Sequence, residues 1–284
     1  MKTAPEYELI SVEIDGPVCK IHLDREQKYN AMNQQMIQEI TEALSWSAKH
    51  SVSQQGGLFD ENNSENLRII VLSAAGKHFC AGADINMMRD AGSKTAEENR
   101  EDSRRLDALF NGLWSHPCFT IGRVQSLALG GGAGLIACLD HVIATDNVKI
   151  ALSEGKLGIL PAVIGPYVYR RVGSACFRRL SMQASRIDSE EALRIGMIEQ
   201  VVSSPDEFDD KVQPLIEEVL STGPMAVSSA KELTLGFDRW QENDEQLRNW
   251  TLDFTSKMRG GAEGQEGLSS FLETKKPNWH PDSK

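Results

Sequence analysis

The sequence predicts an α/β fold, in which short strands alternate with helices before a helical C-terminal part. Residues 69–72 and 119–124 are short apolar runs of the kind that fill a buried parallel sheet. Segments with helical spacing of apolar residues lie between such runs. After about residue 185 the strand patterns fade and helical patterns replace them. We therefore expect an α/β core over residues 1–205 and a helical region over residues 206–284.

The N-terminal elements have clear local signals. Residues 10–14 and 18–23 alternate apolar and polar side chains, and the Asp15-Gly16 pair between them predicts a β-hairpin. A helix follows over residues 30–49, with Asn33 as its expected N-cap. The polar stretch 51–68 is expected to be a surface loop.

Local signals also predict the later helices and strands. Asp188, with Glu191 three positions on, predicts a helix that ends near Gly196. Gly236 is expected to close a helix that opens at residues 221–224, and Gly260-Gly261 to break the chain. The other expected elements are helices over 106–114, 134–139, 241–258 and 266–275, and strands over 142–144 and 149–152.

Composition narrows the classes of function. The 284 residues are 40% hydrophobic and 25% charged, as in an ordinary globular protein. A net charge of −11 disfavours nucleic-acid binding. The longest apolar runs fall short of the ~20 residues of a membrane helix, and residues 1–10 lack a signal-like apolar segment. We therefore expect a cytoplasmic protein without nucleic-acid or membrane contacts.

The five cysteines show neither a C-x-x-C pair nor ligand-like spacing with histidine. We expect reduced thiols, with Cys118 and Cys138 in the core, and no metal site.

Two short turns about fifty residues apart carry the chemical signal. Residues 78–84 (HFCAGAD) and 129–134 (LGGGAG) each join an apolar run to a helical pattern. Small residues at such junctions leave backbone N–H groups unpaired, and two turns facing each other would form a two-donor oxyanion hole. A flexible loop is the plain alternative for the second turn. The second turn does not match the dinucleotide-binding fingerprint G-x-G-x-x-G, because the sixth position counted from Gly130 is Leu135 instead of glycine.

Two carboxylates accompany these turns. Asp84 is expected to cap the helix that follows it. Glu154 follows one apolar run and precedes another, which favours a partly buried carboxyl with a raised pKa, suited to proton transfer.

At this point the chain resembles the enoyl-CoA hydratase/isomerase (crotonase) superfamily over essentially its whole length. The order and spacing of several segments together carry the resemblance, which no single motif decides. These are residues 23–26 (LDRE), 30–32 (NAM), 81–84, 130–132, Glu154, 161–173 and 271–279.

The resemblance implies a spiral core of β-β-α units with a C-terminal helical region for oligomerisation into trimers or hexamers. It also implies that the N–H groups of Ala83 and Gly131 hold the carbonyl oxygen of an acyl-CoA thioester, with Glu154 as a catalytic residue. Coenzyme A would arrive as part of the substrate, with no other cofactor. The implied contacts to CoA and substrate are Arg25, Ala31, Ala81, Asp84, Ile85, Gly134, Phe271 and Lys275.

One departure from the family pattern affects the reaction. The best-known hydratases use two glutamates, and the position of one of them is Gly134 in this chain. A single glutamate resembles the Δ3,Δ2-enoyl-CoA isomerases, and also the branch that acts on 3-methylglutaconyl-CoA. The second resemblance is longer, at residues 86–89, 102–106 and 160–167, so we favour a hydratase of that branch.

A physical rationale for that preference is that Gly134 would leave room beside a branched acyl group. An Arg could then neutralise the second carboxylate of such a substrate, with Arg89, Arg104 and Arg105 as candidates. The alternatives are the isomerase and, in another class, a non-catalytic acyl-CoA-binding or RNA-binding member. Retention of Glu154 and both turns disfavours a non-catalytic role.

Overall fold

A six-stranded sheet in the order β1-β2-β3-β4-β6-β8 forms the centre of the computed structural model, which describes residues 3–283. β1 and β2 pair antiparallel through the predicted hairpin, and the other neighbours pair in parallel. The strands are β1 (Ile10–Asp15), β2 (Val18–Leu23), β3 (Ile69–Ala74), β4 (Phe119–Val124), β6 (His141–Thr145) and β8 (Gln200–Val202). A smaller parallel sheet joins β5 (Leu127–Leu129) to β7 (Lys149–Ala151).

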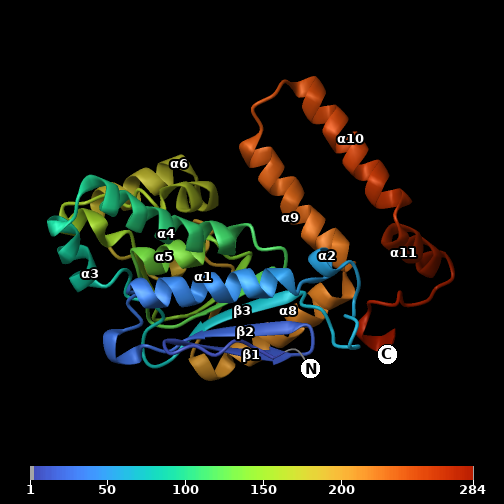
Figure 1. The fold of residues 1–284 in the computed structure, drawn as a ribbon, viewed down its shortest axis with the longest axis horizontal. Helices are drawn as coiled ribbons and strands as arrows, with labels where there is room; N and C mark the ends of the chain where they lie inside the picture. Colours follow the sequence, from blue (N-terminus) through green and yellow to red (C-terminus); the bar gives the residue numbers. More distant parts are fainter. Residues whose placement is uncertain (1–2, 284) are drawn as a thin grey trace.

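The sheet is covered on both faces. In β3, Ile70 and Leu72 point into a large core, whereas Ile69 and Val71 point into a smaller one on the opposite face. Helix α1 (Gln34–Lys49) and helix α4 (Ala96–Trp114) cover the large core, and α8 (Phe208–Ser221) covers the small one (Figure 1). This two-sided burial explains why β3 consists almost entirely of apolar residues.

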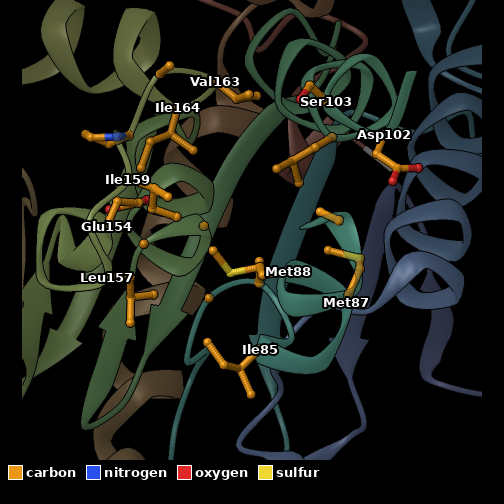
Figure 2. A pocket seen from close by; sticks show the side chains of 18 of the residues that line it. Ile85, Met87, Met88, Asp102, Ser103, Glu154, Leu157, Ile159, Val163 and Ile164 are labelled. Carbon is orange, nitrogen blue, oxygen red and sulfur yellow. The ribbon is translucent and has the colours of Figure 1, made fainter. Parts of the chain in front are cut away.

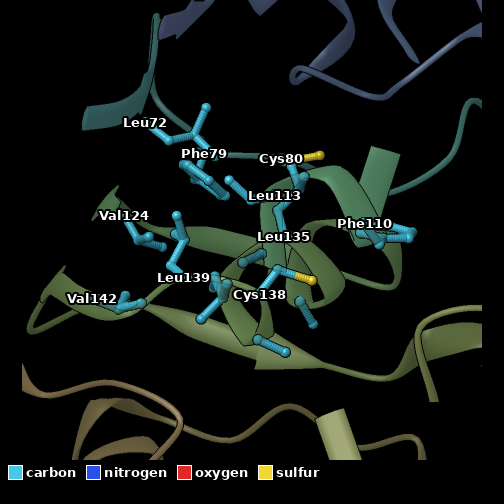
Figure 3. Close-up of a cluster of buried hydrophobic side chains, with 14 of the residues drawn as sticks. Leu72, Phe79, Cys80, Phe110, Leu113, Val124, Leu135, Cys138, Leu139 and Val142 are labelled. Carbon is cyan, nitrogen blue, oxygen red and sulfur yellow. The ribbon is translucent and has the colours of Figure 1, made fainter. Parts of the chain in front are cut away.

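Helix α5 (Gly131–Ala137) is buried along its whole length. Leu135 lies among the fully buried side chains of Phe79, Phe110 and Leu113 (Figure 3). The close packing fixes the helix N-terminus, which is the part that matters for the site.

The C-terminal helices extend away from the sheet as an arm (Figure 1). The arm consists of α9 (Pro224–Arg239), α10 (Asp244–Gly260) and α11 (Ala262–Leu272). Not one residue of α10 is buried within the described chain. The tail then returns to the body, where Arg68 donates hydrogen bonds to the carbonyls of Thr222 and Trp279. The arm is therefore tethered at both ends and exposed between them.

The expected α/β core with a helical C-terminal region is confirmed. The N-cap at Asn33 is also confirmed, since its side chain accepts the N–H of Met36 at 2.9 Å. The remaining helices are α2 (Val52–Gln55) within the expected loop, α3 (Ile85–Asp90), α6 (Gly165–Gln183) and α7 (Ser189–Arg194), and single 3₁₀ turns lie between elements. No helix within residues 3–283 combines the length and apolarity needed to cross a membrane. The boundary at residues 205/206 stays a prediction.

Several predicted bounds are wrong. Helix α4 begins at Ala96 rather than 106, because Thr95 and Glu98 form a capping box. Helix α5 begins at Gly131 rather than 134. Helix α9 runs through Gly236, which lies under the Trp250 ring, to Arg239. Strand β8 was not expected, since only three residues form it.

Candidate active site

The two small-residue turns lie against each other. Cys80 donates its N–H to the carbonyl of Leu127 and accepts the N–H of Leu129, both at 3.0 Å. The first turn is thereby held alongside β5, the strand that leads into the second turn. Gly82 has φ +101°, and a Cβ there would lie 2.8 Å from the Leu129 carbonyl oxygen. Glycine is required because the turns themselves are in contact.

Two backbone N–H groups are left free by this arrangement. Met32 bonds to the Gly82 carbonyl and to the Asp84 N–H, so the N–H of Ala83 between them points the other way. Gly131 is the first residue of α5, where an N–H has no partner within the helix. Neither N–H has a hydrogen-bond acceptor among residues 3–283.

The two free N–H groups are also close together. A Cβ on Gly131 would lie 3.7 Å from the Ala83 nitrogen. The N-terminal end of α5 adds its partial positive charge at this point. The geometry is that of the predicted oxyanion hole.

Glu154 lies beside this pair of donors, in the 3₁₀ turn Ser153–Leu157 that follows β7. Its Oε1 lies 3.1 Å from the position of a Cβ on Gly130, the residue before α5. Its Oε2 is buried and accepts no hydrogen bond within the described chain. Burial raises the pKa of Glu154 above the usual glutamate value. A carboxyl with a raised pKa is better suited than an ordinary glutamate to hold and release a proton during catalysis.

A cavity of about 380 Å³ connects these groups (Figure 2). Its walls are mainly apolar and come from α3, α4, both turns and the loop after Glu154. Five predicted site residues line it, namely Ala81, Ala83, Ile85, Gly131 and Glu154. An apolar cavity with a few convergent polar groups is the usual form of a small-molecule site.

Arg25, Ala31 and Asp84 form a second group beside the first turn. The Arg25 guanidinium donates to the Ala31 carbonyl at 2.6 Å and to the Asp84 carboxylate at 2.7 Å. Asp84 also accepts the N–H of Asn86, which confirms it as the N-cap of α3. The Arg25 hydrogen bond lowers the pKa of Asp84. These residues hold the loop before Met32 against the turn, and their contact with CoA stays a prediction.

The structure contradicts one expectation about Gly134. We expected open space there, beside the acyl group. Instead, a Cβ on Gly134 would lie 2.4 Å from Ile164 Cγ2 and 2.9 Å from Phe110 Cε1. Gly134 is buried, does not line the cavity, and its space is filled by these two side chains.

Phe271 and Lys275 lie far from the cavity within this chain. Figure 1 shows α3, at the cavity, and α11 at opposite ends of the molecule. Both residues are exposed, and Lys275 pairs with Glu273 at 2.8 Å. These two residues do not meet the cavity within the described chain, and their contact with CoA stays a prediction.

The cavity also has walls that the sequence did not predict. Met87 and Met88 on α3 and Ile159 and Ile164 after Glu154 all line it (Figure 2). The available signals were the family-like segments, since Met87 and Met88 lie within residues 86–89 and Ile164 within residues 160–167 and 161–173. Of the three arginines considered for a substrate carboxylate, Arg105 lines the cavity, while Arg89 and Arg104 do not.

The cysteines and possible metal ligands add nothing to the site. Cys118 and Cys138 are buried, as expected, and all five cysteines are free thiols. Within residues 3–283, no three His, Cys, Asp or Glu side chains are grouped so that they could hold a metal ion.

Comparison with known proteins agrees with the geometry. The sequence profile described as enoyl-CoA hydratase/isomerase matches residues 13–282. The short-chain-enoyl-CoA hydratase of Clostridium acetobutylicum is 30% identical over 95% of this chain and 97% of its own. The crotonyl-CoA hydratase of Syntrophomonas wolfei is 28% identical over 96% and 98%.

Solved structures of similar proteins share the fold of this chain. An enoyl-CoA hydratase from Shewanella pealeana superposes with a TM-score of 0.87 at 34% identity, covering 96% of this chain and 97% of that one. AtuE of Pseudomonas aeruginosa gives a TM-score of 0.84 at 33% identity, covering 96% and 100%.

Proposed function

The chain belongs to the enoyl-CoA hydratase/isomerase family, and from this premise we propose that it adds water to the double bond of an α,β-unsaturated enoyl-CoA thioester. One observation carries the proposal. The free N–H groups of Ala83 and Gly131 meet beside the half-buried carboxyl of Glu154 in a single apolar cavity.

The chemistry follows from these three groups. The thioester oxygen accepts hydrogen bonds from Ala83 and Gly131, which stabilise the negative charge that develops on it. The Glu154 carboxylate takes a proton from water while the water oxygen bonds to the β-carbon. The electrons of the double bond move onto the thioester as an enolate. Glu154 then returns the proton to the α-carbon, so that one carboxyl serves both steps.

The test is Glu154→Gln, assayed by loss of the conjugated enoyl-thioester absorbance with crotonyl-CoA. Removing a positioned acid/base typically costs 10²–10⁴-fold in rate, so we expect kcat to fall on the order of 10³-fold. The matched control is Glu217→Gln, an exposed glutamate on α8. Hydration at the wild-type rate in Glu154→Gln would refute the role of Glu154.

For the acyl group, we propose a short chain, and a 3-methylglutaconyl-like group remains a candidate. Arg105 lines the cavity, which supports an acyl group with a terminal carboxylate. The space next to Gly134 is filled, however, so it does not support an acyl group that is branched at the β-carbon. Comparing crotonyl-CoA with 3-methylglutaconyl-CoA as substrates decides between them. Coenzyme A would be bound as part of the substrate, with no other cofactor.

A second candidate, Δ3,Δ2-enoyl-CoA isomerisation, is favoured by a specific observation. The position next to Glu154 that a second carboxylate would occupy is filled by Ile164. A single carboxyl in apolar surroundings is suited to moving a proton between carbons 2 and 4. Migration of a 3-enoyl double bond faster than water addition would favour this reaction.

We further propose that the protein forms a homotrimer or hexamer in the cytoplasm. The arm supports this, because α10 buries no residue and the side chains of Leu252 and Phe271 are 66% and 82% exposed. Exposed apolar surface of this extent usually marks an interface.

A further inference from the structure

Ile164 takes the place of a side chain that residue 134 does not have. The Cγ2 of Ile164 lies 2.4 Å, and its Cβ 3.0 Å, from where a Cβ on Gly134 would stand. Ile164 is 3% exposed, yet it lines the same cavity as Glu154. Its side chain therefore forms part of the wall that a bound acyl group would meet.

Ile164 and Glu154 lie against two residues four positions apart at the N-terminal end of helix α5. The N–H of Gly134 bonds to the Gly130 carbonyl at 3.0 Å, and four residues of helix span about 6 Å along its axis. Glu154 Oε1 lies against Gly130, and Ile164 lies against Gly134. Figure 2 shows both side chains on the same side of the cavity.

On the side of Ile159 and Ile164, Glu154 has no polar neighbour among residues 3–283 to help hold a water molecule. Its Oε2 is buried without a hydrogen-bond partner in the described chain. An ordered buried water needs two to four polar partners. Ile159 and Ile164 supply none. The polar groups near Glu154 lie on its Gly130 side, namely Ser153 Oγ and the two free N–H groups that would hold the thioester oxygen.

Ile164 is held firmly in this position. It precedes helix α6, and its carbonyl accepts the N–H of Val168 at 3.1 Å. The Phe110 ring, which also fills the space at Gly134, packs against Tyr167 with ring centroids 6.0 Å apart. A β-branched side chain between such neighbours has few other rotamers.

We propose that Ile164 is a specificity-determining residue, which limits the space for water next to Glu154 and thereby sets the ratio of water addition to double-bond migration. The proposal rests on the function proposed above, since both reactions use the same oxyanion hole and the same carboxyl. In hydration the proton comes from water. In migration Glu154 carries one from carbon 4 to carbon 2, or the reverse, and no water is consumed.

The experiment measures both reactions on each variant, with crotonyl-CoA for hydration and a 3-enoyl-CoA for migration. Ile164→Ala opens room for a water beside Glu154, so we expect the ratio of hydration to migration to rise on the order of tenfold, as for a change of one or two methylenes in a pocket. Ile164→Val should stay within about threefold of wild type. Val163→Ala is the matched control from the same cavity wall, expected to change both rates by a common factor.

The outcomes separate the two proposals. If the wild type catalyses neither reaction, the proposed function fails. If it catalyses at least one and Ile164→Ala leaves the ratio unchanged, or Val163→Ala shifts it equally, only the inference on Ile164 fails.

Discussion

Glu154 is buried at a cost in stability, because its charged form loses hydration without gaining a partner for Oε2. Burial raises its pKa above the ordinary 4.5. The folded state then binds the proton more tightly than the unfolded state does. Stability therefore falls as pH rises from the ordinary value through the raised one.

Glu154→Gln should remove this pH dependence. We expect the variant to gain stability relative to wild type as pH rises from about 4 to about 8, with no gain at the acidic end. Melting temperatures measured across that range check the prediction, and Glu217→Gln should follow the wild-type curve. A constant difference between Glu154→Gln and wild type at every pH would contradict it.

The pair Arg25–Asp84 has the opposite dependence. Their side chains are only 13% and 11% exposed, and the Arg25 hydrogen bond lowers the pKa of Asp84 below its ordinary 3.8. We expect Asp84→Asn to cost about 3 kcal/mol at neutral pH, because Arg25 is left buried without a counter-charge. The cost should shrink as pH falls through the lowered pKa, where the wild-type carboxyl also becomes neutral.

Asp188→Asn is the matched control for this substitution. Asp188 also caps a helix, accepting the Glu191 N–H at 3.0 Å, and asparagine caps as well as aspartate. Its change in unfolding free energy should stay within about 0.5 kcal/mol. Equal losses for Asp84→Asn and Asp188→Asn would show that the ion pair adds nothing.

Single residues also show how far the sequence could predict the site. Ala83, Gly131 and Glu154 could be predicted, because they are marked by local sequence patterns. Ala83 and Gly131 lie in small-residue turns, and Glu154 lies between two apolar segments. Ile164 could not, because its role depends on filling a space left by a glycine thirty positions earlier, on another helix. The need for glycine at position 82 could not be predicted either, because it depends on contact with the neighbouring turn, where a Cβ would lie 2.8 Å from the Leu129 carbonyl oxygen.

At the scale of elements, two glycines within helices should respond in opposite ways to alanine. A Cβ on Gly134 in α5 would lie 2.4 Å from Ile164, whereas a Cβ on Gly112 in α4 would meet only Leu44, at 4.0 Å. We expect Gly134→Ala to cost about 2 kcal/mol through overpacking. Gly112→Ala should gain about 0.5–1 kcal/mol from helix propensity. Chemical unfolding of the two variants measures both.

Adding Ile164→Ala to Gly134→Ala supplies the decisive comparison. If the two side chains compete for one space, the double variant should lose less stability than the sum of the single losses. Additive losses would show that Ile164 does not fill the space next to Gly134.

The predictability of the elements follows from their packing. The strands over 69–74 and 119–124 were evident because both of their faces are mostly buried and each carries a run of apolar residues. The first half of α4 was not, because residues 96–105 contribute no buried side chain to mark a helical face. Its start depends on the Thr95 capping box alone.

At the scale of the whole molecule, the site and the C-terminal tail lie apart within the described chain. Figure 1 places α3 and α11 at opposite ends, and neither Phe271 nor Lys275 lines the cavity. Closed symmetric oligomers repeat one contact around an axis, so that the tail of one subunit could complete the site of the next. The arm geometry is compatible with such an exchange.

Mixing two variants tests this exchange directly. Glu154→Gln removes the acid/base and keeps the tail, whereas Lys275→Ala keeps Glu154 and is expected to raise KM for the CoA thioester with little change in kcat. If Lys275 acts on a neighbouring subunit, mixed oligomers from co-expression contain sites with both residues intact. Part of the measured activity should then show the wild-type KM for the CoA thioester.

The control co-expresses Glu154→Gln with a chain that carries both substitutions, and it should recover no activity because no site contains Glu154. If Lys275 acts within its own chain, every site with Glu154 in the first mixture still lacks Lys275. Activity would then keep the raised KM at every mixing ratio, and the tail would have to reach the site by a rearrangement of its own arm.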